Sequence, residues 1–288
     1  NAPRIRIDND QANNKYIFYY LQSGHVLRQQ KQRFTGNAQP FLDTNDIGDF
    51  SILLPPKDEQ EKISTLIRTW DKAIETVDKL IENSQKQKKW LMQNLLTGKK
   101  RLPGFNGEWK KGRLSTLCTI EKGTQKNKDT LDQSGNHPVI NGGIQPSGYC
   151  DEYNTEPHTI TISEGGNSCG YVGLVNVPFW CGGHCYALHN LKIGHMFLYQ
   201  ALKSVEPEIM KLRVGSGLPN IQKKDLSNVD VYFPEKNEQL RIASVLASQD
   251  NLIQAQRNIL ELLTREKNSL MQNLLTGKFR TISMDSNE

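Results

Sequence analysis

The stretch Leu-Met-Gln-Asn-Leu-Leu-Thr-Gly-Lys occurs twice in this chain, at residues 91–99 and again at residues 270–278. The offset between the two copies holds far upstream without a gap. A match of this length indicates an internal duplication, so each half of the chain is expected to carry one copy of the same unit. Matched pairs include Pro55 and Pro234, Glu59 and Glu238, Gln60 and Gln239, Ile63 and Ile242, and Asp71 and Asp250.

Each copy carries a helical period after its proline. Apolar residues recur at alternating spacings of four and three, which is the a/d seam of a heptad repeat. The sequence predicts a first helix within residues 55–101 and a second within 234–278, each about 60 Å long at roughly 1.5 Å per residue. Gly98 and Gly277 stand where a glycine cap ends a helix. The predicted seam residues are Ile63, Ile67, Trp70, Ile74, Ile81, Leu91 and Leu95, and then Ile242, Leu246, Ile253, Leu260, Leu270 and Leu274.

Two such helices, separated by a whole domain, can lie antiparallel and bury their seams against each other as a coiled coil. Alternatively, each helix packs into an ordinary bundle. Polar residues also interrupt the seam, and they either fix the register of the pair, at some cost in stability, or face water. They are Ser84, Lys88, Gln249, Gln256 and Lys267.

The composition is that of a soluble globular protein with one large or two ordinary domains. Of the 288 residues, 36% are apolar and 23% are charged. No stretch approaches the roughly 20 apolar residues of a membrane span, and the start shows no signal peptide. We therefore expect a cytoplasmic protein that contacts no membrane. Because the sequence starts at Asn1 without a methionine, a fragment or a shortened chain is expected.

Positive charge is concentrated in one segment. The whole chain carries a formal net charge of +5, whereas residues 86–128 contain twelve lysines and arginines against two glutamates. Concentrated positive charge favours a phosphate backbone, because each neutralised phosphate releases counterions. The alternative is a solvated basic face that has no partner.

The chain shows few signs of chemistry of its own. Cys181, His184 and Cys185 are close enough in sequence to suggest zinc, but structural zinc sites normally use two paired knuckles and only one pair exists here. We therefore predict reduced, buried thiols and no metal site. Glu108 and Lys110 resemble the end of a nuclease metal site, yet no aspartate precedes them on a strand. No phosphate-binding loop is present, so no catalytic residue is predicted.

The remaining segments differ in completeness. Residues 1–54 contain a strand-like run at 4–8, a helix-like run at 16–22 and a strand-like run at 51–54, and they match residues 181–233 in outline, with Phe18 and Tyr20 opposite Phe197 and Tyr199. They are therefore interpreted as the rear part of a first domain that lacks its front part.

Residues 102–233 are interpreted as a complete second domain. Alternating strands are expected near 158–163 and 171–176, and a helix near 195–203. The expected fold class is thus α+β, a mixed and mostly antiparallel sheet domain together with two long helices packed as an antiparallel coiled coil. Residues 279–288 form a polar tail.

Polar loops near the strand ends of that domain are candidates for DNA contact. Asn and Gln can pair with adenine and Arg with guanine in the major groove, whereas Ser, Lys and backbone N–H groups more often hold phosphates. For each of these residues taken singly, the alternative to DNA contact is an ordinary exposed turn. The run Glu164-Gly165-Gly166 could look like a catalytic loop, but a tight turn is its more common meaning. The candidates are Lys122, Lys126, Lys128, Asn141, Gln145, Ser147, Tyr149, Asn167, Arg213, Ser216, Asn220 and Lys223.

The sequence resembles one family closely, the DNA specificity subunits of type I restriction-modification enzymes. The resemblance rests first on the order of segments, which is a partial domain, a long helix, a domain and a second long helix. It also rests on the proline followed by a Glu-Gln pair at the start of each long helix, and on the identical sequence at the end of both helices. Residues 102–233 resemble a target recognition domain of that family, notably in the runs at 141–149 and 179–184.

This resemblance implies a non-catalytic protein that binds double-stranded DNA. Each recognition domain would read one half of a bipartite site, and the paired helices would set the spacing of the half-sites and dock DNA adenine methyltransferase subunits. Those partners would bring S-adenosylmethionine, and a restriction subunit, a motor and nuclease, would bring ATP and Mg; no cofactor is expected in this chain. Because the first domain is incomplete, the chain is expected to read one half-site well and the other poorly or not at all, unless another chain completes that domain. Self-association of two chains is therefore a hypothesis.

Two other functions stay open. The chain could be a coiled-coil scaffold whose middle domain binds protein, or the recognition module of a single-chain restriction-methylation enzyme. DNA binding should weaken steeply with salt, whereas an apolar protein interface should not.

Overall fold

A computed structural model describes residues 4–7, 10–34, 42–127, 131–132, 134–215, 217 and 219–281 of the chain. The chain divides into two compact units. The first unit comprises residues 1–84 and 252–288, and the second unit comprises residues 85–251. Within the described ranges, no helix combines the length and the apolar character that crossing a bilayer requires.

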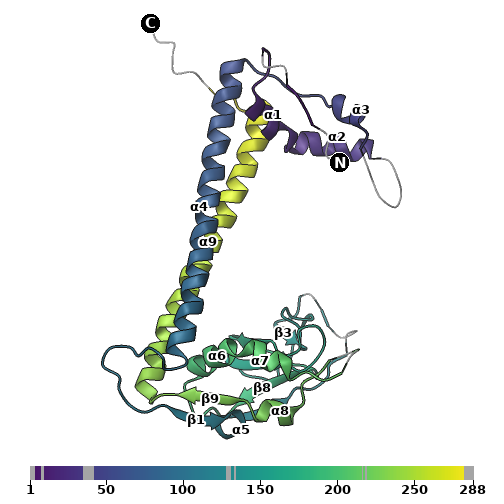
Figure 1. Cartoon of the computed structure of the whole chain (residues 1–288). Helices are drawn as coiled ribbons and strands as arrows, with labels where there is room; N and C mark the ends of the chain where they lie inside the picture. Colours follow the sequence, from purple (N-terminus) through teal and green to yellow (C-terminus); the bar gives the residue numbers. More distant parts are fainter. Residues whose placement is uncertain are drawn as a thin grey trace. The chain divides into compact units, whose positions relative to one another are not determined.

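Two long helices, α4 (Lys57–Leu95) and α9 (Lys236–Leu275), contribute to both units. In the first unit, Ile63 and Ile67 of α4 share a core with Met271 and Leu274 of α9. In the second unit, Leu95 near the end of α4 shares a core with residues near the start of α9. The helices therefore pair antiparallel, side by side (Figure 1), which confirms the predicted coiled coil and the α+β class.

No predicted seam residue is exposed. Eight of the thirteen are buried and the other five are half-buried. The glycines at the helix ends also behave as predicted, since Gly98 has φ +69° and Gly277 has φ +72°, a left-handed conformation that costs glycine little. The buried seam residues are Ile63, Ile67, Ile81, Leu95, Ile242, Leu246, Ile253 and Leu274; the half-buried ones are Trp70, Ile74, Leu91, Leu260 and Leu270.

Three short helices complete the first unit: α1 (Asn14–Leu21), α2 (Gly24–Arg33) and α3 (Thr44–Gly48). Asn13 caps α1 because its side chain accepts hydrogen bonds from the backbone N–H groups of the first turn. Tyr16, Tyr20 and Val26 are buried against the apolar face of α4. The core of this unit is therefore mainly helical within the described residues, with Ala12, just before α1, as a buried non-helical member.

Two strands predicted in the first unit are wrong. Residues 4–7 and residues 51–54 form no strand, although the first run alternates as strands do and the second is a short apolar run. A strand needs a neighbour for its N–H and C=O groups, and no described segment of the first unit supplies one. Leu53 and Leu54 consequently remain about half exposed, at 51% and 48%.

The second unit contains three small sheets instead of the single sheet that the alternating segments suggested. A central antiparallel sheet has the strand order β2-β8-β5-β6, and a second has the order β4-β3-β7, in which β3 and β7 run parallel. A two-stranded sheet pairs β1 with β9. The strands are β1 (Lys110–Arg113), β2 (Thr119–Lys122), β3 (His137–Ile140), β4 (Tyr149–Cys150), β5 (Thr159–Ser163), β6 (Val172–Val175), β7 (Trp180–Cys181), β8 (Cys185–His189) and β9 (Asp230–Phe233).

Strand β5 lies inside the central sheet, and all five of its residues are buried. Helix α6 (His195–Ser204) packs on this sheet, with Phe197, Leu198 and Leu202 in the same core as Ile160. The shorter helices are α5 (Leu114–Leu117), α7 (Glu206–Lys211) and α8 (Lys223–Ser227). This packing fixes the end of β5, from which the candidate site is built.

The duplication extends to the short helices, but with a shift. The backbone N–H of Asn13, before α1, donates to Gln60 Oε1 at 2.8 Å, and that of Gly194, before α6, donates to Gln239 Oε1 at 2.8 Å. Helix α1 therefore matches α6 at a slightly larger offset than the one that relates α4 to α9. The gapless match of Phe18 with Phe197 is thus wrong by two positions, because the connection between the short and the long helix differs in length between the two copies.

Candidate nucleic-acid interface

Glu164, directly after β5, joins the ends of several strands. Its side chain is largely buried, and its Oε1 accepts hydrogen bonds from Lys122 Nζ at 2.6 Å and from Tyr186 Oη at 3.2 Å. Its Oε2 lies 3.6 Å from Nδ1 of His184. Since Lys122 ends β2 and Tyr186 belongs to β8, one carboxylate holds three strands of the central sheet together at this edge.

Backbone hydrogen bonds connect three loops at the same place. The N–H of Glu164 donates to the carbonyl of His184 at 2.9 Å, and the N–H of Ile221 donates to the carbonyl of Glu164 at 2.8 Å. The N–H of Gly166 reaches the carbonyl of Pro219 at 3.1 Å. The loops at 164–170, 182–184 and 213–222 therefore form one connected surface, which we call the loop cluster.

Asn141 brings the loop after β3 into the loop cluster. Its Oδ1 accepts the backbone N–H of His184 at 3.1 Å, and Ser163 Oγ donates to the carbonyl of Gly142 at 2.6 Å. Gly182 permits this approach, because a Cβ there would lie 2.5 Å from Asn141 Oδ1. Any other residue at that position would push the two loops apart.

Six of the predicted DNA-contacting residues lie in or beside the loop cluster. All except Asn141, which is half-buried, are exposed. Asn220 pairs in short bridges with Gly165 and with Val214, which fixes the backbone of the loop that carries it. The set offers amides, a guanidinium and the ammonium of Lys223 on one edge of the sheet, while the ammonium of Lys122 is paired with Glu164. Its members are Lys122, Asn141, Asn167, Arg213, Asn220 and Lys223.

The other predicted residues are placed differently. Gln145, Ser147 and Tyr149 are exposed on the hairpin of β3 and β4, in the three-stranded sheet, and no interaction described joins them to Glu164. Lys126 has its ammonium 3.9 Å from the centre of the Trp180 ring and pairs with a glutamate. Lys128 and Ser216 lie outside the described residues.

The basic segment at 86–128 is partly neutralised inside the second unit. At least five of its cations within the described residues form ion pairs with carboxylates of the same unit. The positive charge available to a phosphate backbone is therefore smaller than the sequence count suggests. The pairs are Lys88 with Asp250, Arg101 with Glu238, Lys111 with Asp230, Lys122 with Glu164 and Lys126 with Glu152.

Three protic side chains near the loop cluster, Tyr186, Cys169 and Cys185, have raised pKa values. Burial, followed by the charge of Glu164, raises the pKa of Tyr186 to about 12, so its hydroxyl remains a donor. Burial also raises the pKa of the Cys169 thiol, and contact with Cys181, together with burial, raises that of Cys185. These thiols are protonated and packed, which does not favour nucleophilic chemistry.

The Cys181, His184 and Cys185 run does not converge as metal ligands do. Both thiols are buried and donate to backbone carbonyls, whereas the His184 side chain is 61% exposed and faces Glu164. Among the described residues, no group of three His, Cys, Asp or Glu side chains could hold a metal ion.

Glu164 and Tyr186 were missed as organising residues by reasoning from the sequence. A glutamate that immediately follows five residues of buried strand was an available signal, because a buried carboxylate needs partners. Tyr186 gave none, since a tyrosine within an apolar strand usually belongs to a core.

Comparison with known proteins agrees with this architecture. A family model described as type I restriction modification DNA specificity domain matches residues 3–83 and 106–265. The chain belongs to this family. Among its relatives, a protein named as a type I specificity subunit of Mycoplasma genitalium is 34% identical over 161 residues, which cover 54% of this chain and 42% of that protein. The MjaVIII type I restriction enzyme specificity subunit of Methanocaldococcus jannaschii is 25% identical, covering 94% of this chain and 71% of that one.

The solved structures show the same fold. The S subunit of a type I restriction-modification system from M. genitalium gives a TM-score of 0.72 at 21% identity, and it covers 93% of this chain and 74% of that one. A structure described as bearing on complex assembly of the type I system gives a TM-score of 0.61 at 24% identity, covering 96% and 74%. The chain spans less than half the length of two Mycoplasma relatives that are 34% identical to it, 42% and 46%.

Proposed function

We propose that the second unit of this chain is a target recognition domain that binds double-stranded DNA in a sequence-specific manner. The observation that carries the proposal is the loop cluster, in which hydrogen bonds of Glu164, Asn141 and Ser163 join four loops and leave amide, guanidinium and ammonium groups exposed on one edge of the sheet. Asn and Arg side chains on fixed loops suit base edges, and lysines suit phosphates. Membership of the specificity-domain family supports the same assignment.

In this proposal the chain is a non-catalytic specificity subunit that directs methyltransferase and restriction subunits to a bipartite DNA site. The paired helices α4 and α9 set the spacing of the half-sites and dock the methyltransferase subunits. Their lengths of 39 and 40 residues support a spacing role, since each would extend about 60 Å at roughly 1.5 Å per residue. S-adenosylmethionine, ATP and Mg belong to the partner subunits.

The first unit has a smaller share in this function. Among its described residues it has helices only, with no counterpart of the loop cluster. We therefore propose that this chain reads one half-site through its second unit, and that the other half-site is read by a further segment or by a second copy of the chain.

A protein scaffold is the second candidate, because at least five of the described cations of the basic segment are already paired and less charge is free for DNA. Selection of bound duplexes from a random pool, followed by affinity measurement at several salt concentrations, separates the candidates. DNA recognition predicts enrichment of a short motif and an affinity for it that falls steeply with salt. Recovery of an unenriched pool, with weak binding at all salt concentrations, would favour the scaffold.

A further inference from the structure

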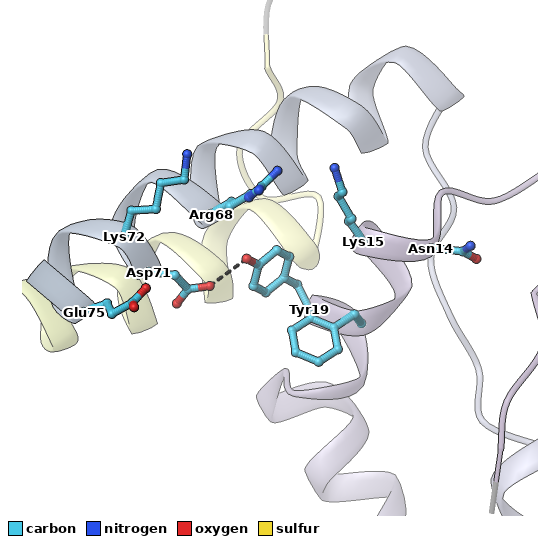
Figure 2. Close-up of a pocket in the computed structure, with 8 residues that line it drawn as sticks. Asn14, Lys15, Tyr19, Arg68, Asp71, Lys72 and Glu75 are labelled. Atoms are coloured by element: carbon cyan, nitrogen blue, oxygen red, sulfur yellow. Dashed lines mark hydrogen bonds between the residues drawn. The ribbon is translucent and has the colours of Figure 1, made fainter.

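A groove in the first unit lies between α1 and α4 and has a volume of about 450 Å³. Tyr19 lies against it, with its hydroxyl donating to Asp71 Oδ2 at 2.6 Å (Figure 2). Phe18 also lines the groove, and 60% of its surface is exposed. An aromatic ring that is exposed next to a groove offers an apolar contact to a ligand.

The charges that line this groove are unbalanced. Its two carboxylates are already matched, because Asp71 accepts from Tyr19 and pairs with Lys267, and Glu75 pairs with Lys79. Three exposed cations also line it, Lys15, Arg68 and Lys72, and no ion pair of theirs is seen among the described residues. In Figure 2 their side chains extend toward the same side of the two helices.

The internal duplication shows that the fold does not require these cations. At the corresponding positions of the second unit, Met196 replaces Lys15, Ala247 replaces Arg68 and Asn251 replaces Lys72. A groove of about 240 Å³ lies between α6 and α9 beside these positions, and Met196 and Ala247 line it whereas Asn251 does not. The same helix pair thus carries a basic groove in one unit and an uncharged one in the other.

We propose that the groove of the first unit docks an acidic segment of a protein partner, one that carries carboxylates together with an aromatic or aliphatic side chain. The carboxylates face Lys15, Arg68 and Lys72, and the apolar side chain rests on Phe18. A phosphate backbone matches the cations but offers no apolar group to the exposed ring, so a protein segment fits the lining better than DNA. The proposal does not depend on what the loop cluster binds.

The test uses the whole chain and a fluorescein-labelled peptide made of repeated Glu-Phe-Glu-Ala units, with binding followed by fluorescence anisotropy. The variant K15M/R68A/K72N takes the residues of the second unit, so its helices should stay intact, which circular dichroism checks. We expect its affinity for the peptide to be about tenfold weaker than that of the unmodified chain, since three exposed charge pairs are lost. Phe18→Ala should weaken binding as well, and added salt should do the same.

A matched control removes three exposed cations outside the groove, in K211M/K236N/R241A. Its affinity for the peptide should change less than about twofold. Equal losses in the two triple variants would overturn the proposal, as would the absence of saturable binding by the unmodified chain. Displacement of the peptide by a DNA duplex, with the same sensitivity to K15M/R68A/K72N, would assign the groove to nucleic acid instead.

Discussion

The two units of the chain share the paired long helices α4 and α9, which we call the frame, and they differ in the elements that pack on this frame. In the first unit, Glu59 near the start of α4 pairs with Arg280, and in the second unit, Glu238 near the start of α9 pairs with Arg101. The two glutamates, and likewise the two arginines, are related by the same offset as the repeated helix ends. Each ion pair therefore links the start of one long helix to the segment that follows the end of the other long helix. This shared contact explains why a glutamate occurs at the same place near the start of both helices.

The polar positions inside the seam follow the same rule. Lys267 pairs with Asp71 in the first unit, and Lys88 pairs with Asp250 in the second. These lysines were predicted either to fix the register or to face water, and both are engaged with the opposite helix, while the seam positions Ser84 and Gln249 are buried. Contacts that occur in both copies belong to the helix pair, whereas among the described residues the sheets and the loop cluster occur only in the second unit, to which we assign DNA recognition as a proposal.

The largest test of the shared frame removes equivalent core residues. Ile67 and Leu246 occupy matching positions, and both are fully buried. Ile67→Ala and Leu246→Ala should each lower the free energy of unfolding by about 2–4 kcal/mol, because the lost apolar contacts leave a cavity. Hydrogen exchange with mass spectrometry should place the loss of protection in the first unit for Ile67→Ala and in the second for Leu246→Ala.

Leu66→Ala is the matched control, because Leu66 is adjacent to Ile67 but 40% exposed. It should cost less than about 1 kcal/mol. Equal loss of protection in both units after either core substitution would show that they unfold as one, and the division into two units would not describe their stability.

A smaller effect is expected from the repeated ion pairs. The side chain of Glu238 is fully buried beside an arginine that is 25% exposed, whereas Glu59 pairs with Arg280, which is 63% exposed. Glu238→Gln should therefore cost about 3 kcal/mol, since it leaves a partly buried arginine without its counter-charge. Glu59→Gln should cost about 1 kcal/mol. Urea unfolding measures both, and a larger cost at Glu59 would reverse this ranking of the two copies.

The Glu59 pair also predicts a dependence on pH. The hydrogen bonds from Arg280 are the main reason why the pKa of Glu59 lies below its ordinary value of 4.5. Because the folded-state pKa is the lower one, the stabilisation is present above about pH 4.5 and is lost as the pH falls through the folded-state pKa. In Glu59→Gln, unfolding measured over the same range should lack this part of the acid dependence.

The sequence predicted the frame better than the site. The repeated motif, the heptad spacing and the glycine caps are local patterns, so the helices and their antiparallel pairing followed directly. The strand predicted at 51–54 was wrong because strand formation depends on a neighbouring strand, which a short apolar run does not reveal. Asn141 and Asn220 were predicted individually, but their meeting around Glu164 depends on hydrogen bonds between loops far apart in sequence.

The smallest effects concern DNA affinity and rest on the proposed function. Lys223 is exposed at the start of α8, next to the loop cluster, and its counterpart in the first unit is Thr44. Lys126, by contrast, is held by Trp180 and Glu152. Lys223→Ala should weaken binding about threefold to fivefold for all sequences and reduce the salt slope by roughly one, as expected for a phosphate contact. The measurement is a duplex titration at several salt concentrations.

Lys126→Met is the control within the same unit, and Thr44→Ala is the control in the other. Both should change the affinity by less than about twofold, because the ammonium of Lys126 is already occupied and Thr44 carries no charge for a phosphate. If Lys126→Met proved the more damaging change, the free cations around the loop cluster would not be the groups that meet DNA. Lys122 and Lys126 would then have to separate from Glu164 and Glu152 when DNA binds. The recognition surface would in that case include the β7 edge of the three-stranded sheet.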